Sequence, residues 1–374
     1  MDDAVRGVDA HGFPVETKAA GMISRRKLGW MMTATASGAV ALAAPGRASA
    51  AAFPAASNGA GAPSAAGLGP VRHVRTDVLR IAYHVVGPTD GTPVILLHGW
   101  PFSPVGSYAS VAPMLAEQGY RCYIPYLRGH GETRFLRKDT VRSGQQGALG
   151  ADLVDFMDAL GIHRAVFAGY DWGGRAANVA AALWPERCIA LVSVNNYLIQ
   201  NIAAADVPLA PSLENGYWYF FYFLTERGRA GLRKDPKEFA RVVWHRNSPE
   251  WQFSEAELDE AASLWTNPDY VDVVIHGYRH RLGAVPGDPR YARVENRLAA
   301  QPPIPVPTVT LDGQSDGVTP PTDGSSTASH FTGARVHHIV PNAGHDLPQE
   351  QPGPFASAVR EAVALSHHAH GRRA

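Results

Sequence analysis

The stretch GYDWGG at residues 169–174 follows the apolar run AVFA at residues 165–168 and precedes the small-residue run RAANVA at residues 175–180. This order predicts a strand, a sharp turn and a helix, with Asp171 in the turn. A residue at such a bend has a strained backbone, and glycines on either side remove Cβ atoms that would collide. The free N–H groups at the start of a helix favour a carboxylate there. Asp171 is therefore the first candidate for a reactive side chain.

The layout is that of the nucleophile elbow G-x-S-x-G, with aspartate in the place of serine. A serine alkoxide attacks an acyl carbon, whereas a carboxylate can displace a leaving group from saturated carbon and become an alkyl ester. The motif therefore indicates the opening of an epoxide or the removal of a halide, not the cleavage of an ester. The alternative is that Asp171 is an ordinary helix N-cap after a strand.

A second motif lies upstream of the elbow. The apolar run PVILL at residues 93–97 predicts a buried strand that leads into HGWP at residues 98–101. In enzymes with this elbow, one oxyanion donor follows this strand and the other follows the nucleophile. By position, these donors are the backbone N–H groups of Trp100 and Trp172, and each is typically worth about 3–4 kcal/mol of transition-state stabilisation. The alternative for Trp100 is an aromatic side chain that covers the core.

An acid follows the nucleophile in the order that this type of triad requires. The predicted strand PTVTL at residues 307–311 leads into DGQSDG at residues 312–317. Asp316 falls on the loop beyond the end of the strand, where it can reach a histidine. Asp312 is the competing candidate because it lies closer to the strand.

A histidine then follows the acid. The predicted strand VHHIV at residues 336–340 leads into NAGHDLP at residues 342–348. His345 falls in a short loop before the last helix, which is the place expected for the base. His337 and His338 fall on the strand itself, so each is expected to face the core or solvent.

Together these motifs resemble those of the α/β-hydrolases of the epoxide hydrolase and haloalkane dehalogenase group. The matching stretches are HGWP (98–101), GYDWGG (169–174), Gly-His (344–345) and RGHG (128–131), and the resemblance covers roughly residues 70–370. It implies an α/β-hydrolase fold, with a mostly parallel eight-stranded sheet flanked by helices and an inserted helical cap. We expect neither a cofactor nor a metal.

The resemblance also implies how the chain is divided. We expect the α/β-hydrolase core at residues 71–195 and 301–370, and the cap at residues 196–300, where aromatic and charged residues interrupt the alternation of strands and helices. About 300 residues are enough for one large core and a cap.

Two cap tyrosines distinguish the epoxide-opening members of the group, because their phenols donate hydrogen bonds to the epoxide oxygen. The first position falls in WYFFYFL (218–224), where the match indicates Tyr219, although the adjacent register would give Tyr222. The second falls in HGYRH (276–280) and indicates Tyr278. The alternative is that these rings only pack the cap, as aromatic stripes at helical spacing commonly do.

The resemblance therefore implies a hydrolase that opens a small apolar epoxide with water to a vicinal diol, through an ester of Asp171. A dehalogenase with the same nucleophile is the alternative, since the indole of Trp172 could bind a halide. The fluoroacetate-type members carry arginine next to the nucleophile, where this chain has Trp172, although Arg175 occupies their second arginine position. A third hypothesis is a binding protein without activity, which would not need Asp171, Asp316 and His345 together.

The beginning of the chain predicts export. SRRKLGW (24–30) is a twin-arginine pattern, an apolar run follows at residues 31–44, and ASA (48–50) offers a cleavage site. We expect residues 1–50 to be a signal peptide that binds the twin-arginine export machinery, which would place the protein outside the cytoplasm. The alternative is a basic N-terminus of a cytosolic protein. Residues 51–70 are rich in Ala, Gly, Ser and Pro and predict a flexible linker.

Composition bears on nucleic-acid binding and on the state of the cysteines. Lys and Arg number 34, as do Asp and Glu, so the formal net charge is zero and there is no electrostatic footprint for nucleic acid. Cys122 and Cys188 both begin predicted core strands that are not neighbours in this fold. We therefore expect buried free thiols, not a disulfide.

Overall fold

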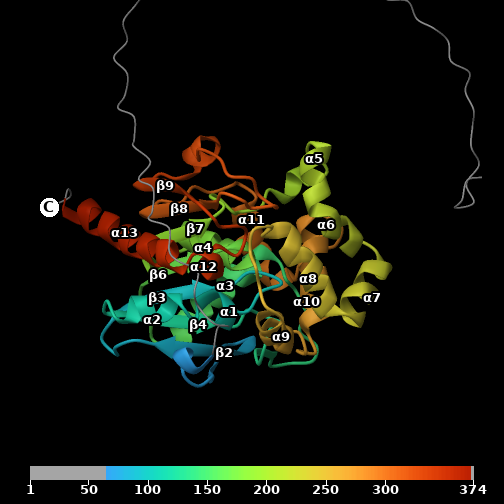
Figure 1. Ribbon diagram of the computed structural model, residues 1–374, viewed down its shortest axis with the longest axis horizontal. Helices are drawn as coiled ribbons and strands as arrows, with labels where there is room; N and C mark the ends of the chain where they lie inside the picture. Colours follow the sequence, from blue (N-terminus) through green and yellow to red (C-terminus); the bar gives the residue numbers. More distant parts are fainter. Residues whose placement is uncertain (1–64, 372–374) are drawn as a thin grey trace, which may run out of the picture. The chain divides into compact units, whose positions relative to one another are not determined.

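The computed structural model describes residues 65–371 (Figure 1). The predicted signal peptide at residues 1–50 lies outside this range, so export stays a prediction. Residues Ala65–Leu68 form a 3-10 helix and Leu68 is fully buried. The packed domain therefore begins before the predicted end of the linker at residue 70. Within residues 65–371, no helix has both the length and the apolar character of a membrane span.

A nine-stranded sheet forms the core of this domain. Its order is β1-β2-β4-β3-β6-β7-β8-β9, and the two-residue strand β5 pairs with β2 outside this path. Strand β2 pairs antiparallel with β1, β4 and β5, whereas all other pairs are parallel. The predicted α/β-hydrolase fold is confirmed, with β5 added to the eight expected strands. The strands are β1 (Arg72–Arg75), β2 (Leu79–Val86), β3 (Thr92–Leu97), β4 (Tyr120–Pro125), β5 (Arg134–Phe135), β6 (Ala165–Gly169), β7 (Cys188–Val194), β8 (Thr308–Gly313) and β9 (Arg335–Val340).

Helices cover the sheet, and this is why its central strands are apolar along their length. All five residues of β6 are buried. Helix α13 packs against α2 and lies along β7 and β8, whereas α3 and α4 pack on each other, with α4 along β3, β6 and β7 (Figure 1). The helices of the core are α1 (Pro104–Tyr108), α2 (Val111–Ala116), α3 (Gln146–Ala159), α4 (Asp171–Leu183), α12 (Leu347–Glu350) and α13 (Pro352–Gly371).

The α-helices between β7 and β8 lie in the predicted cap range, and Figure 1 shows most of them in yellow and orange beside the sheet. They are α5 (Pro211–Glu214), α6 (Trp218–Phe223), α7 (Glu226–Lys234), α8 (Pro236–Asn247), α9 (Glu255–Leu264), α10 (Tyr270–Arg281) and α11 (Ala292–Leu298). Helix α11 lies within the predicted cap range of 196–300, but it packs on α3, and its Leu298 lies in one cluster with Val179 and Leu183 of α4. By its packing, α11 therefore belongs with the core, because its apolar side faces core helices.

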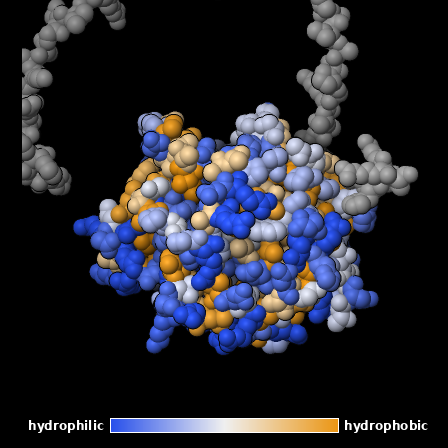
Figure 2. All heavy atoms as spheres, turned by 180° about the vertical axis from the view of Figure 1, so that it is seen from behind, coloured by the Kyte–Doolittle hydropathy of each residue, from blue (hydrophilic) through white to orange (hydrophobic). Residues whose placement is uncertain are grey.

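Two further observations concern the interior and the surface. Cys122 in β4 and Cys188 in β7 are buried and free, as predicted. Figure 2 shows hydrophilic and hydrophobic residues interspersed over one face of the molecule.

Candidate active site

Asp171 lies at the sharp turn between β6 and α4. Its φ is +49°, in the left-handed region that side chains rarely adopt. A Cβ at Gly173 would come within 2.2 Å of the carbonyl oxygen of Leu97, and one at Gly169 within 2.9 Å of the Gly173 backbone. The close packing of the backbone around Asp171 therefore keeps this residue in its strained conformation. Tyr170 is the N-cap of α4, so the alternative that Asp171 is an ordinary N-cap is wrong.

The two carboxylate oxygens of Asp171 have different partners. Oδ1 accepts a hydrogen bond of 2.8 Å from the backbone N–H of Trp100, and Oδ2 lies 3.6 Å from Nε2 of His345. Burial by itself would raise the pKa of Asp171. The imidazole of His345, the guanidinium of Arg175 and the Trp100 N–H more than offset it, so the pKa is lowered. Asp171 is therefore ionised at neutral pH, as a nucleophile must be. The second predicted oxyanion donor, the Trp172 N–H, follows it in the first turn of α4.

His345 lies between two carboxylates. Its Nδ1 hydrogen bonds to Oδ2 of Asp316 at 2.8 Å, on the opposite side of the ring from Asp171. Burial would lower the pKa of His345, but the negative charges of Asp316 and Asp171 raise it to about 10. The resting site therefore contains an imidazolium between two carboxylates. If the charge of Asp171 is lost, the pKa of His345 must fall toward the range of a base.

Asp316 is held by four hydrogen bonds. Its Oδ1 accepts from the backbone N–H groups of Val318 at 2.7 Å and Thr319 at 2.9 Å. Its Oδ2 accepts from the side-chain amide of Asn195 at 3.0 Å, in addition to the bond with His345. The carboxylate can therefore orient the imidazole through Nδ1 while its own orientation is fixed.

The competing acid, Asp312, lies in a different network. The side-chain amide of Asn196 donates to both of its oxygens, at 2.9 and 3.1 Å, and the backbone N–H of Thr322 donates at 2.9 Å. Asp312 therefore fixes the loops after β7 and β8, and Asp316 is the carboxylate that contacts His345.

No motif in the sequence marked Asn195 or Asn196 as a residue of the site. Both have left-handed backbones, with φ of +67° and +64°, directly after β7. Asparagine tolerates this region better than most residues. Two successive asparagines at the end of a buried strand could have indicated them, because functional loops follow the carboxyl ends of parallel strands.

The two predicted tyrosines lie together. The rings of Tyr219 and Tyr278 are 5.6 Å apart, and each also contacts the ring of Trp100, at 5.7 and 5.3 Å. Both are buried, and burial together with the charge of Asp171 raises the pKa of each phenol, so both hydroxyls stay protonated. The indole Nε1 of Trp172 donates to Oη of Tyr278 at 3.2 Å. Tyr222 instead stacks on Phe239, with ring planes 10° apart. Tyr219, not Tyr222, therefore lies beside Tyr278 and Trp100.

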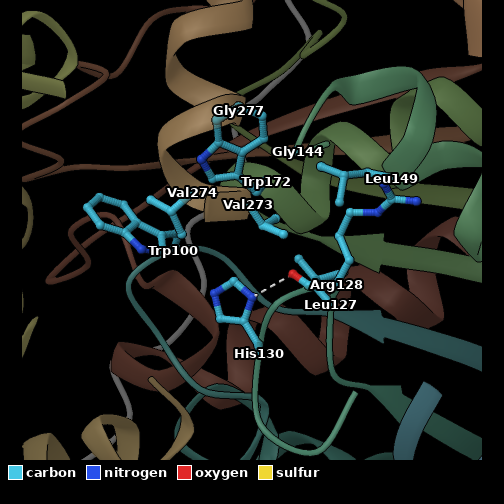
Figure 3. A pocket seen from close by; sticks show the side chains of 10 residues that line it. All are labelled: Trp100, Leu127, Arg128, His130, Gly144, Leu149, Trp172, Val273, Val274 and Gly277. Atoms are coloured by element: carbon cyan, nitrogen blue, oxygen red, sulfur yellow. Dashed lines mark hydrogen bonds between the residues drawn. The ribbon is translucent and has the colours of Figure 1, made fainter. Parts of the chain in front are cut away.

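A small cavity of about 30 Å³ lies beside the two tryptophans (Figure 3). Trp100 and Trp172 line it together with His130, whose Nδ1 hydrogen bonds to the carbonyl of Arg128 at 3.1 Å. Burial lowers the pKa of His130 to about 4, so this ring is neutral and differs in charge from His345.

A larger cavity of about 750 Å³ is lined by Arg175, by residues 195–201 and by the aromatic residues Tyr217 and Phe220. Trp172 lines the small cavity and Arg175 the larger one, so α4 contributes a side chain to each. Within the residues that the structure describes, no group of three or more His, Cys, Asp or Glu side chains is arranged to hold a metal ion.

Comparisons with known proteins agree with the fold. The alpha/beta hydrolase fold family matches residues 92–352. Epoxide hydrolase A of Mycobacterium tuberculosis is 28% identical over 316 residues, which cover 78% of this chain and 96% of that protein. A crystal structure of a candidate epoxide hydrolase from Klebsiella pneumoniae is 48% identical, with a TM-score of 0.78, over 80% of this chain and 99% of that one. A second candidate epoxide hydrolase, from Pseudomonas aeruginosa, is 22% identical with a TM-score of 0.66 over 80% and 97%, and shows the fold alone.

Proposed function

Because this chain belongs to the alpha/beta hydrolase fold family, we propose that it is an epoxide hydrolase that forms a vicinal diol through an alkyl ester of Asp171. The observation that carries this proposal is an aspartate at the nucleophile elbow, 3.6 Å from a histidine that Asp316 orients. An aspartate there forms an ester with saturated carbon, and the histidine provides the base that hydrolyses the ester. The names of the two most similar relatives reported above support the same activity.

In the first step, Tyr219 and Tyr278 donate hydrogen bonds to the epoxide oxygen. Asp171 attacks the less hindered carbon, the ring C–O bond breaks and the ester C–O bond forms. The alkoxide takes a proton from a phenol, and this proton is replaced from the imidazolium of His345. The hydrogen bond from Trp172 to Tyr278 opposes the effect of burial on the pKa of that phenol, and this makes the phenol a better donor.

In the second step, His345 is the base. The ester has removed the negative charge of Asp171, so the neutral imidazole can take a proton from water. The resulting hydroxide attacks the carbonyl carbon of the ester. The Trp100 N–H, which already donates to Oδ1 of Asp171, stabilises the oxyanion together with the Trp172 N–H. Collapse of this intermediate releases the diol and restores both Asp171 and the imidazolium.

Halide removal is the competing reaction, and the indole contacts favour the epoxide. The Nε1 atom of Trp172 donates to Tyr278, and that of Trp100 donates to Tyr270 at 2.8 Å. Both indole N–H groups that could bind a halide therefore already have acceptors. A protein of this fold with only a binding role would not need an imidazolium held between Asp171 and Asp316.

The proposal is tested by assaying the purified protein with styrene oxide, 1-chlorobutane and fluoroacetate in parallel. We expect diol from styrene oxide and no halide from the other two, measured by chromatography and by a halide electrode. Halide release without diol formation would establish the dehalogenase instead. If no substrate of either class is converted, the binding protein becomes the better hypothesis.

Tyr219→Phe and Tyr278→Phe should each lower kcat/KM for styrene oxide by about 100-fold, because each removes one donor to the developing alkoxide. Tyr222→Phe is the matched control. It makes the same chemical change in the same helix as Tyr219, and we expect less than about a twofold effect. A normal rate for Tyr219→Phe, or a large loss for Tyr222→Phe, would show that the register of the first tyrosine is wrong.

A further inference from the structure

The C-terminal end of cap helix α8 contacts the two loops that carry Asp316 and His345. The backbone N–H of Gly317, next to Asp316, donates to the carbonyl of Asn247 at 2.9 Å. The backbone N–H of His345 donates to Oγ of Ser248 at 2.9 Å. Two adjacent cap residues thus hold the loops after β8 and β9, which belong to the core.

Ser248 is linked to a buried carboxylate of α12. Its hydroxyl donates to Oε1 of Glu350 at 2.7 Å, while Oε2 of Glu350 accepts from the backbone N–H of Gly344 at 2.7 Å. The N–H groups of Gly344 and His345 are therefore fixed in succession, one by Glu350 and the next by Ser248. Ser248 is fully buried and Glu350 is only 7% exposed, so water does not compete for these bonds.

The approach between helix and loops is close. A Cβ at Gly344 would lie 2.5 Å from Cα of Ser248, and one at Gly317 would lie 2.0 Å from the carbonyl oxygen of Arg246. The same helix is attached to the loop after β3, because the indole Nε1 of Trp244 donates to the carbonyl of Pro101 at 3.0 Å. The end of α8 therefore cannot move away from the core without releasing the backbone of His345.

We infer that Ser248 is a positioning residue for His345, and that Glu350 fixes the Ser248 hydroxyl for this role. The imidazole has one partner at each nitrogen, Asp316 at Nδ1 and Asp171 at Nε2. In the substrate ester the second partner is lost. The ring then depends on Asp316 and on its own backbone, which Ser248 holds, to point Nε2 at the hydrolytic water.

The inference rests on the proposed function, and it predicts an effect on the hydrolysis of the ester but not on its formation. The attack that forms the ester needs Asp171 and the tyrosines, with His345 supplying only the proton that restores the phenol, whereas hydrolysis of the ester needs a correctly oriented His345. Loss of the Ser248 hydroxyl should therefore slow hydrolysis about tenfold, the effect expected for one buried hydrogen bond, and leave ester formation within about twofold of normal.

The experiment mixes Ser248→Ala enzyme rapidly with styrene oxide, quenches it with acid and measures the intact protein mass over time. We expect the esterified form to dominate at steady state, and kcat and KM to fall together. Ser263→Ala is the matched control, because it removes an exposed cap hydroxyl that bonds only to the carbonyl of Glu260 at 2.7 Å. This control should behave as the wild type.

A His345→Gln variant, measured in parallel, distinguishes failure of the positioning role of Ser248 from failure of the proposed function. If it accumulates ester and Ser248→Ala hydrolyses its ester at the wild-type rate, the positioning role is wrong and the proposed function stands. If His345→Gln gains no mass, the ester mechanism itself fails. A decrease in kcat at unchanged KM, without ester, would show that Ser248 has only a structural role.

If Ser248→Ala fails to fold, Glu350→Gln provides a second variant for the same test. Its amide oxygen can still accept from Gly344, but its NH₂ group cannot accept from Ser248. We expect the same accumulation of ester to a smaller extent. A normal ester lifetime in this variant would overturn the part of the inference that concerns Glu350.

Discussion

An Asp171→Ala variant should form no diol, with kcat/KM lowered by at least about 10⁴-fold, because removing the nucleophile removes the covalent route entirely. In the part of the chain that the structure describes, Asp171 is the only carboxylate that lies at the elbow turn and accepts the Trp100 N–H. Diol formation from styrene oxide is to be monitored by chromatography over hours.

Asp171→Asn provides the matched control for this prediction. Asparagine retains an oxygen that can accept from Trp100 and tolerates the φ of +49° better than alanine. Both variants should therefore be inactive, although only the alanine also loses the oxygen contact. Retention of more than about a hundredth of the wild-type rate in either folded variant would show that the nucleophile is another group.

A His345→Gln variant should form the ester and then stop. The first step needs the ionised Asp171, which remains, whereas hydrolysis needs a base, so multiple turnover should fall by about 10³-fold or more. Intact mass should show one added substrate per protein molecule, and peptide mapping should place this mass on the peptide that contains Asp171. Asp316→Asn should show the same trapping in weaker form, because the imidazole then loses the negative charge beside Nδ1 that raises its pKa.

Asp312→Asn is the control for the acid, since Asp312 binds Asn196 and Thr322 instead of the base. It should lower thermal stability without trapping ester. Normal multiple turnover by His345→Gln, or added mass on a peptide without Asp171, would contradict the mechanism.

The sequence could predict the parts of the site that depend on local chain geometry. The elbow requires glycines at fixed positions around Asp171, and the structure shows the close contacts that explain them. The sheet follows from apolar runs of strand length, as the fully buried β6 illustrates. The location of His345 in the loop after β9 depends on the same alternation of strand and loop.

The sequence could not predict contacts that depend on packing between distant segments. Asp312 lies at the end of β8 and Asp316 on the loop that follows it, and only the positions of Asn196 and His345 distinguish their contacts. The register of Tyr219 and Tyr222 depends on which side of α6 faces Trp100. Ser248 carries no motif, because its role arises only when the end of α8 meets the loop of His345.

The sequence by itself determined the fold family and predicted the proposed nucleophile, acid and base in their order, because these follow from short motifs and strand-length patterns within single segments. Only the tertiary structure decided which carboxylate contacts the histidine, which tyrosine of α6 lies against Trp100 and which residue binds the backbone N–H of His345. These choices depend on hydrogen bonds of about 3 Å between segments far apart in the chain, and no local pattern of residues encodes such distances.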